Sequence, residues 1–111
     1  MNKFDKIYGL VGKKLGHSFS KDYFNKKFSE LNLNYSYQNI EIDNISDIIP
    51  FVKENNNLKG FNVTVPYKES IIPYLDELDT TAKEVGAVNT VKIHDDGRLQ
   101  GFNTDVFGFS R

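Results

Sequence analysis

The chain has 111 residues, which suffices for one domain with its own core and is short for a two-domain enzyme. Lysine and arginine number 14 against 15 aspartate and glutamate residues, so the charge gives no reason to expect a nucleic acid or an anionic membrane as a partner. Cysteine is absent, which excludes disulfides and thiol chemistry, and no stretch has the length of a signal peptide or a transmembrane helix. We therefore expect a cytoplasmic protein whose partner is a small molecule.

The first half of the chain alternates between strand and helix patterns. Residues 6–12 have the apolar composition of a short buried strand that closes on glycine. A helix is expected from Ser20, a suitable N-cap, with aromatic residues behind it at helical spacing. Residues 35–42 predict a second strand, and the apolar phase slips near residues 38–39, which indicates a bulge or a change of buried face. A second helix is expected to be capped by Ser46.

The segment from Gly60 to Lys68 has the most specific pattern in the chain. Apolar residues alternate with polar ones, which is the period of a strand with two different faces; the apolar set is Phe61, Val63 and Val65, and the polar set is Asn62 and Thr64. Pro66 has no N–H for a sheet ladder, so the strand should end at Val65. Lys68 then lies just past the carboxyl end of the strand, where open α/β sheets bind ligands. A solvated edge strand followed by a surface lysine would have the same pattern.

The second half predicts two helices and a hairpin. Residues 69–78 have the pattern of a helix interrupted by Pro73, and residues 80–85 that of a short helix that ends at glycine. Residues 87–93 and 98–102 are expected to be strands joined by an Asp-Asp-Gly hairpin turn. Together these elements predict a three-layer α/β fold, with helices on both faces of a mainly parallel mixed sheet and one antiparallel strand.

Several polar side chains are expected at strand ends. Ser18 and Ser20 lie at a strand-to-helix junction, where backbone N–H groups favour an anion such as a carboxylate, although Ser20 could simply cap the helix. Asn89 interrupts an apolar alternation, so its amide must bind either backbone groups or ligand hydroxyls. If residues 87–93 run against the parallel set, residues 98–102 run with it, and Asp105 then emerges at the same sheet edge as Lys68 and Ser18. No dinucleotide-binding fingerprint, Walker motif, HExxH or GxSxG is present.

Four motifs, in order, resemble the substrate-binding half of the shikimate dehydrogenase family. They are His17-Ser18-Phe19-Ser20, Asn62-Val63-Thr64-Val65-Pro66-Tyr67-Lys68, Gly86-Ala87-Val88-Asn89-Thr90 and Gly101-Phe102-Asn103-Thr104-Asp105. The resemblance implies reversible, NADP-dependent reduction of 3-dehydroshikimate to shikimate in aromatic amino-acid biosynthesis.

The resemblance also implies a role for each matching residue. Ser18 and Ser20 would hold the substrate carboxylate, Asn62, Thr64, Asn89 and Asp105 would bind ring hydroxyls, and Lys68 would be the catalytic lysine with Asp105 as its partner. Two departures from the family pattern are Lys21, where the family often has proline, and the continuation Val106-Phe107-Gly108 after Asp105.

The resemblance further implies that residues 1–111 are one substrate-binding domain and that the dinucleotide-binding half, which binds most of NADP, is absent from this chain. We expect the isolated domain to be inactive in hydride transfer and to self-associate through apolar surface left uncovered. Two alternatives stay open: a dehydrogenase that acts on quinate with NAD, and a non-catalytic ligand-sensing module. Lys68 and Asp105 favour the enzyme, because recognition of a carboxylate alone needs neither residue.

Overall fold

A computed structural model describes residues 4–16 and 19–104, and this part of the chain contains one six-stranded sheet in the order β2-β1-β3-β5-β6-β4. The strands are β1 (Lys6–Gly12), β2 (Tyr35–Glu41), β3 (Leu58–Val63), β4 (Glu77–Leu78), β5 (Thr90–Ile93) and β6 (Leu99–Phe102). Only β5 runs against the other described strands, because it pairs antiparallel with both β3 and β6. The remaining pairs are parallel, which confirms the predicted mixed sheet with one reversed strand.

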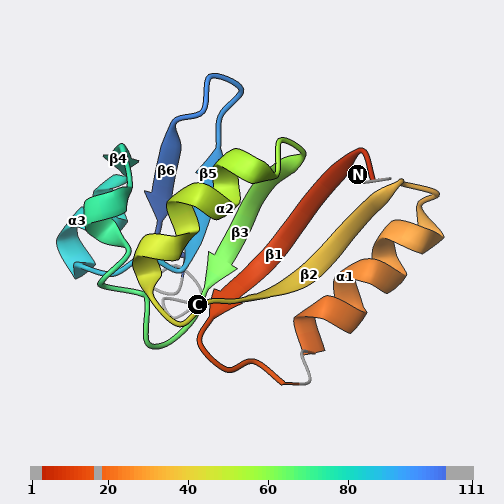
Figure 1. Cartoon of the computed structure of the whole chain (residues 1–111), viewed down its shortest axis with the longest axis horizontal. Helices are drawn as coiled ribbons and strands as arrows, with labels where there is room; N and C mark the ends of the chain where they lie inside the picture. Colours follow the sequence, from red (N-terminus) through yellow and green to blue (C-terminus); the bar gives the residue numbers. More distant parts are fainter. Residues whose placement is uncertain (1–3, 17–18, 105–111) are drawn as a thin grey trace.

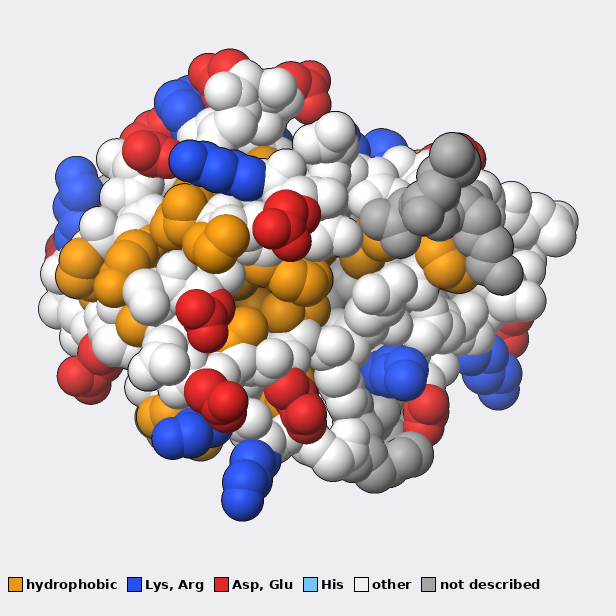
Figure 2. Space-filling model, viewed as in Figure 1, with side chains coloured by type: hydrophobic (Ala, Val, Ile, Leu, Met, Phe, Trp, Pro, Cys, Tyr) orange, Lys and Arg blue, Asp and Glu red, His pale blue; other side chains and the backbone are white. Residues whose placement is uncertain are grey.

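Helices cover both faces of the sheet (Figure 1). The helices are α1 (Phe19–Glu30), α2 (Ile48–Glu54) and α3 (Thr80–Val85), with 3₁₀ turns at Ile45–Asp47 and Ile72–Tyr74. On one face, α1 places Phe24 against Tyr37 of β2, with ring centroids 5.0 Å apart. On the other face, Ile48 of α2 is fully buried in a core that includes Val11 and Ile40. Figure 2 shows that hydrophobic side chains also reach the surface on this second face, with charged side chains around them.

The structure decides between the two alternatives for β2 and corrects both predicted helix caps. The pairing of β2 with β1 is continuous from Tyr35 to Glu41, so there is no bulge. The phase slip instead reflects a change of buried face, since Tyr37 packs under α1 and Ile40 belongs to the core on the other side. The predicted caps are wrong: α1 begins at Phe19, so Ser20 lies inside its first turn, and Ser46 lies within the 3₁₀ turn that precedes α2.

Strand β3 ends two residues earlier than the sequence predicted. The N–H of Tyr67 donates to the carbonyl of Thr64 at 3.0 Å, which closes a turn directly after the strand. Val65 is 72% exposed, so the expectation that it packs beside Phe61 and Val63 is wrong. The peptide bond between Val65 and Pro66, within this turn, is cis.

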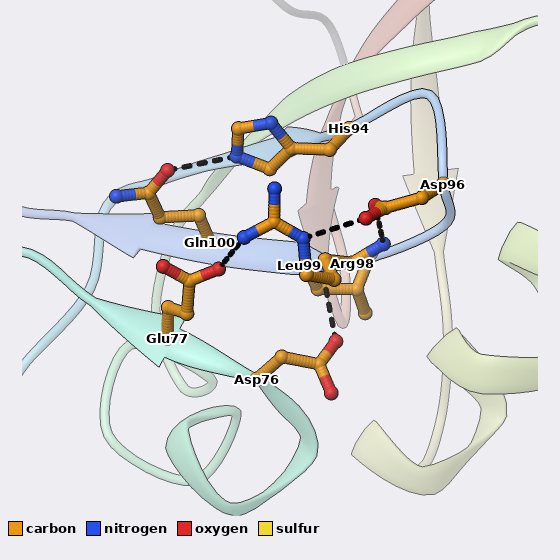
Figure 3. Close-up of polar contacts among 7 residues, drawn as sticks. All are labelled: Asp76, Glu77, His94, Asp96, Arg98, Leu99 and Gln100. Atoms are coloured by element: carbon orange, nitrogen blue, oxygen red, sulfur yellow. Dashed lines mark hydrogen bonds and ion pairs between the residues drawn. The ribbon is translucent and has the colours of Figure 1, made fainter.

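The predicted helix over residues 69–78 is wrong. This segment consists of turns, the 3₁₀ turn around Pro73 and the short edge strand β4. Asp76 holds the segment in register with β6: its N–H donates to the carbonyl of Leu99, and its carboxylate accepts from the N–H of Leu99, both at 2.8 Å (Figure 3). These sheet contacts replace the helical hydrogen bonds that proline would in any case interrupt.

The hairpin between β5 and β6 is confirmed and is fixed by a polar cluster (Figure 3). The guanidinium of Arg98 forms ion pairs with Glu77 of β4 and with Asp96, whose Oδ2 accepts from Nε at 2.8 Å. The hydrogen bond from the backbone N–H of Arg98, together with its side chain, lowers the pKa of Asp96 below its usual range. The cluster lies where β6 begins, so it anchors the edge opposite the carboxyl ends of the parallel strands.

The short helix α3 ends as predicted at Gly86, which adopts a left-handed conformation with φ of 76°. Asp79 caps its first turn by accepting from the N–H of Ala82 at 2.8 Å. We expect Asp79→Ala to lower the free energy of unfolding by about 0.5–2 kcal/mol, measured by urea denaturation. Thr80→Ala, at the exposed neighbouring position, is the control. Equal stabilities for the two variants would show that the cap contributes nothing.

No helix in the described part of the chain is both long and apolar enough to cross a membrane.

Candidate functional site

Three chain segments that are far apart in the sequence meet at the carboxyl edge of the sheet. In Figure 1 the arrows of β3 and β6 point to the same edge, because β5 between them is the reversed strand. The register places Asn62 of β3 opposite Thr90 of β5, and Thr90 opposite Phe102 of β6. The reversed strand therefore brings the start of β5 beside the ends of two parallel strands.

The amides of Asn62 and Asn89 are joined by hydrogen bonds at this edge. Nδ2 of Asn62 donates to Oγ1 of Thr90 at 3.3 Å, and that hydroxyl donates to Oδ1 of Asn89 at 3.0 Å. The backbone N–H of Thr104 donates to the same Oδ1 at 3.1 Å, and Nδ2 of Asn89 donates to Oγ1 of Thr104 at 3.0 Å. Asn89 is buried with 9% of its surface exposed, so the polar residue that interrupts an apolar strand pattern has partners.

Lys68 is held beside the same segment by its backbone. The N–H of Val88, one residue before Asn89, donates to the carbonyl of Lys68 at 2.8 Å. The preceding residue, Tyr67, is buried, and its hydroxyl donates to the carbonyl of Ile42 at 2.5 Å. These contacts fix the chain on both sides of the lysine, whose side chain is half-buried.

The remaining predicted site residues lie around this edge or outside the described residues. Thr64 follows β3, and its N–H donates to the carbonyl of Val11 at 3.0 Å. Ser20 lies in the first turn of α1. Ser18 and Asp105 are outside the described residues, so the predicted pairing of Asp105 with Lys68 stays a prediction.

The turn between β1 and α1 does not offer the phosphate site of a dinucleotide-binding fold. In such folds the backbone N–H groups of this turn bind the pyrophosphate. Here the carboxylate of Glu41 accepts from the N–H of Leu15 at 2.8 Å and from the N–H of Gly16 at 3.4 Å. These two donors are already bound to an anionic side chain, so the described turn does not fit an NADP pyrophosphate. Among the described residues, no cluster of histidine and acidic side chains could hold a metal ion.

Tyr37 is a site residue that the sequence reasoning missed. Its hydroxyl donates to Oδ1 of Asn62 at 2.9 Å, and its ring is stacked on Phe24. Its alternation with Tyr35 predicts only a packed strand face, so no sequence pattern marks the hydroxyl as part of a polar network. Burial raises the pKa of Tyr37 to about 12, which keeps this hydroxyl protonated as a donor at neutral pH.

The raised pKa of Tyr37 predicts a loss of stability in alkali. Because the folded-state pKa exceeds the unfolded value, the stabilisation is complete below about pH 10 and is lost as the pH rises towards about pH 12. Urea denaturation should therefore show a fall in stability between about pH 10 and about pH 11 that is smaller in Tyr37→Phe by up to about 1 kcal/mol, while the raised pKa of the buried Tyr67 contributes to the fall in both proteins. Tyr35→Phe is the control and should retain the fall. A fall of the same size in both variants would assign it to other groups.

A groove of about 680 Å³ lies on the α1 face beside these residues. Its lining combines aromatic side chains, including Tyr8, Phe24 and Phe28, with the polar groups of Asn62 and Thr90. The polar network therefore borders apolar surface that α1 leaves uncovered.

This fold and this edge define the molecule as an α/β domain with a cluster of amides, hydroxyls and a lysine where sheets of this class bind small ligands. The family model described as the shikimate dehydrogenase substrate binding domain matches residues 10–91, so the chain belongs to that family.

Named relatives agree with this assignment. The shikimate dehydrogenase (NADP(+)) of Halothermothrix orenii is 45% identical over 107 residues, which are 95% of this chain and 36% of that protein. The crystal structure of shikimate dehydrogenase from Aquifex aeolicus matches with a TM-score of 0.87 and 41% identity, over 99% of this chain and 41% of that one. Shikimate 5-dehydrogenase from Listeria monocytogenes, solved with shikimate and NAD, matches with a TM-score of 0.86 and 36% identity, over 100% of this chain and 39% of that one. The chain thus spans less than half the length of these relatives.

Proposed function

We propose that residues 1–111 form the substrate-binding domain of an NADP-dependent shikimate dehydrogenase, which interconverts 3-dehydroshikimate and shikimate in aromatic amino-acid biosynthesis. The observation that carries the proposal is the meeting of Asn62, Lys68 and Asn89 at one sheet edge, in a chain that belongs to this family. The names of its relatives support the reaction and the cofactor.

Each polar group at the edge has a role in this proposal. Ser18 and Ser20 bind the substrate carboxylate, while Asn62, Thr64, Asn89 and Asp105 bind ring hydroxyls. This division suits the chemistry, because amides and hydroxyls both donate to and accept from hydroxyl groups, whereas a helix N-terminus favours an anion.

Lys68 is the proposed proton donor. Reduction of a ketone develops negative charge on its oxygen, and a positioned ammonium group stabilises that charge and delivers the proton. Asp105 orients the lysine in this proposal. The hydride comes from the reduced nicotinamide, which the described residues of this chain do not hold by themselves.

The proposal therefore places the dinucleotide-binding residues outside this chain. It also places the reaction in the cytoplasm, a reducing compartment in which the absence of cysteine and of disulfides is ordinary. One alternative has a specific observation in its favour: the Listeria relative was solved with shikimate and NAD, so NAD is the second candidate cofactor.

Ligand titrations test the proposal directly. Addition of shikimate to the ¹⁵N-labelled chain should shift the side-chain amide signals of Asn62 and Asn89, and quinate should shift them less. The same chain should not oxidise NADPH in the presence of 3-dehydroshikimate. Equal responses to both ligands would favour the quinate alternative, and no response to either would refute the proposal. Measurable oxidation of NADPH would refute the assignment to a substrate-binding domain alone.

We also propose that the isolated chain self-associates. Aromatic side chains line the groove beside α1, and Tyr23, Leu31 and Leu33 are exposed by 51%, 59% and 38%. Apolar surface of this kind is usually covered by a partner. Sedimentation velocity should show the apparent mass rising with concentration, and a constant monomer mass would contradict this proposal.

A further inference from the structure

The hydrogen bonds from Tyr37 to Thr104 form one continuous chain across three strands. The hydroxyl of Tyr37 donates to Asn62, Asn62 donates to Thr90, and Thr90 donates to Asn89. At the end of this series of hydrogen bonds, Asn89 is bound by both the backbone N–H and the hydroxyl oxygen of Thr104. The two amides assigned to substrate binding are therefore linked through Thr90, a residue that the family resemblance gave no role.

The donor and the acceptor of every hydrogen bond in this series follow from a single group that can only donate. The backbone N–H of Thr104 is only a donor, so the group of Asn89 that faces it must be the carbonyl oxygen Oδ1. The hydroxyl of Thr90 contacts the same oxygen and must donate its one hydrogen to it. Towards Asn62, Thr90 can then only accept.

The orientation of Asn62 is fixed by this constraint. Because Thr90 accepts, Asn62 must turn its NH₂ group to Thr90 and its Oδ1 to Tyr37. Tyr37 must therefore donate, which it can do because its hydroxyl stays protonated. A flipped amide of Asn62 would place its oxygen against the lone pairs of Thr90, whereas the hydroxyl of Tyr37 could turn and accept from the NH₂ group. Thr90 therefore selects the orientation of the amide, and Tyr37 holds the amide in place.

We propose that Tyr37 and Thr90 are positioning residues that fix the amide of Asn62 in one orientation, with its second N–H held as a donor for the substrate. This inference rests on the proposed function for the identity of the ligand, shikimate. Tyr37 suits the role because its side chain is buried and its ring is stacked on Phe24, so the hydroxyl has little freedom to follow a rotated amide. Neither residue needs to touch the substrate.

The test removes each hydroxyl while keeping the shape of the side chain. Tyr37→Phe and Thr90→Val should each weaken shikimate binding by the whole chain by about 3- to 10-fold, the range expected for one lost hydrogen bond. Thr90→Ser keeps a hydroxyl at this position and should bind within about 2-fold of the unaltered chain, below that range. Tyr35→Phe is the matched control, because the hydroxyl of Tyr35 has no hydrogen-bond partner among the described residues.

A second measurement separates orientation from general loss of structure. The two side-chain N–H signals of Asn62, assigned by their absence in Asn62→Asp, should shift in ligand-free Tyr37→Phe and Thr90→Val but not in Tyr35→Phe or Thr90→Ser. If the unaltered chain does not bind shikimate, the proposed function fails, whereas these shifts would still support the orienting role. Unchanged Asn62 signals in Tyr37→Phe, or undiminished binding by both Tyr37→Phe and Thr90→Val, would overturn the inference.

Discussion

Replacement of Lys68 by methionine is expected to lower kcat by about 10²- to 10⁴-fold when this chain is joined to the part of the Aquifex aeolicus enzyme that it does not cover. Methionine keeps much of the length of the side chain and removes the ammonium group. The transition state then loses both charge stabilisation and a proton donor, while the groups that bind the rest of the substrate remain. The rate of NADPH oxidation with 3-dehydroshikimate measures kcat and KM separately.

The control for this prediction is Lys59→Met. Lys59 lies on β3, the strand that precedes Lys68, at a half-buried position that lines the groove, but it is at the amino end of β3, away from the carboxyl edge. We expect its kcat to stay within about 2-fold of the parent, because surface substitutions away from a site change little. If Lys68→Met and Lys59→Met had similar values of kcat, Lys68 could not be the proton donor.

The antiparallel relation of β5 and β6 was predictable because it follows from a local turn signal, whereas the direction of β5 against the other strands was only a condition of the prediction. The Asp-Asp-Gly turn fixes a hairpin, and one reversed strand within a parallel set then returns the next strand to the parallel direction. Because β5 is the reversed strand, the end of β6 lies at the same edge as the end of β3, as predicted for that case. The amide of Asn89 was also detectable, since a polar residue in an apolar alternation must find partners.

Features that depend on tertiary contacts were not predictable in the same way. The segment around Asp76 has a helix-like composition, yet its hydrogen bonds to Leu99 make it an edge strand. Val65 fits the strand alternation but lies in a turn that forms directly after Thr64. The hydroxyl of Tyr37 reaches Asn62 across β1, which lies between β2 and β3, and no local pattern encodes this strand order.

Ile48→Ala is expected to produce the largest loss of stability among the changes proposed, about 2–5 kcal/mol by urea denaturation. Ile48 is fully buried at the start of α2 and belongs to the core that joins this helix to Val11 and Ile40 of the sheet. Truncation removes apolar contacts and leaves a cavity, which the surrounding core side chains can fill only partly. The loss is a large fraction of the roughly 5–15 kcal/mol that stabilises an ordinary domain.

Two comparisons make this prediction specific to the packing of α2. Val85→Ala, at a position 48% exposed at the end of α3, should change the stability by no more than about 0.5 kcal/mol. At temperatures where Ile48→Ala remains folded, its affinity for shikimate should equal that of the unaltered chain, because Ile48 packs on the face opposite α1 and the groove. A loss for Ile48→Ala no larger than that for Val85→Ala would mean that α2 does not pack against the sheet. Weakened binding by the folded variant would instead mean that the core supports the site from the far face.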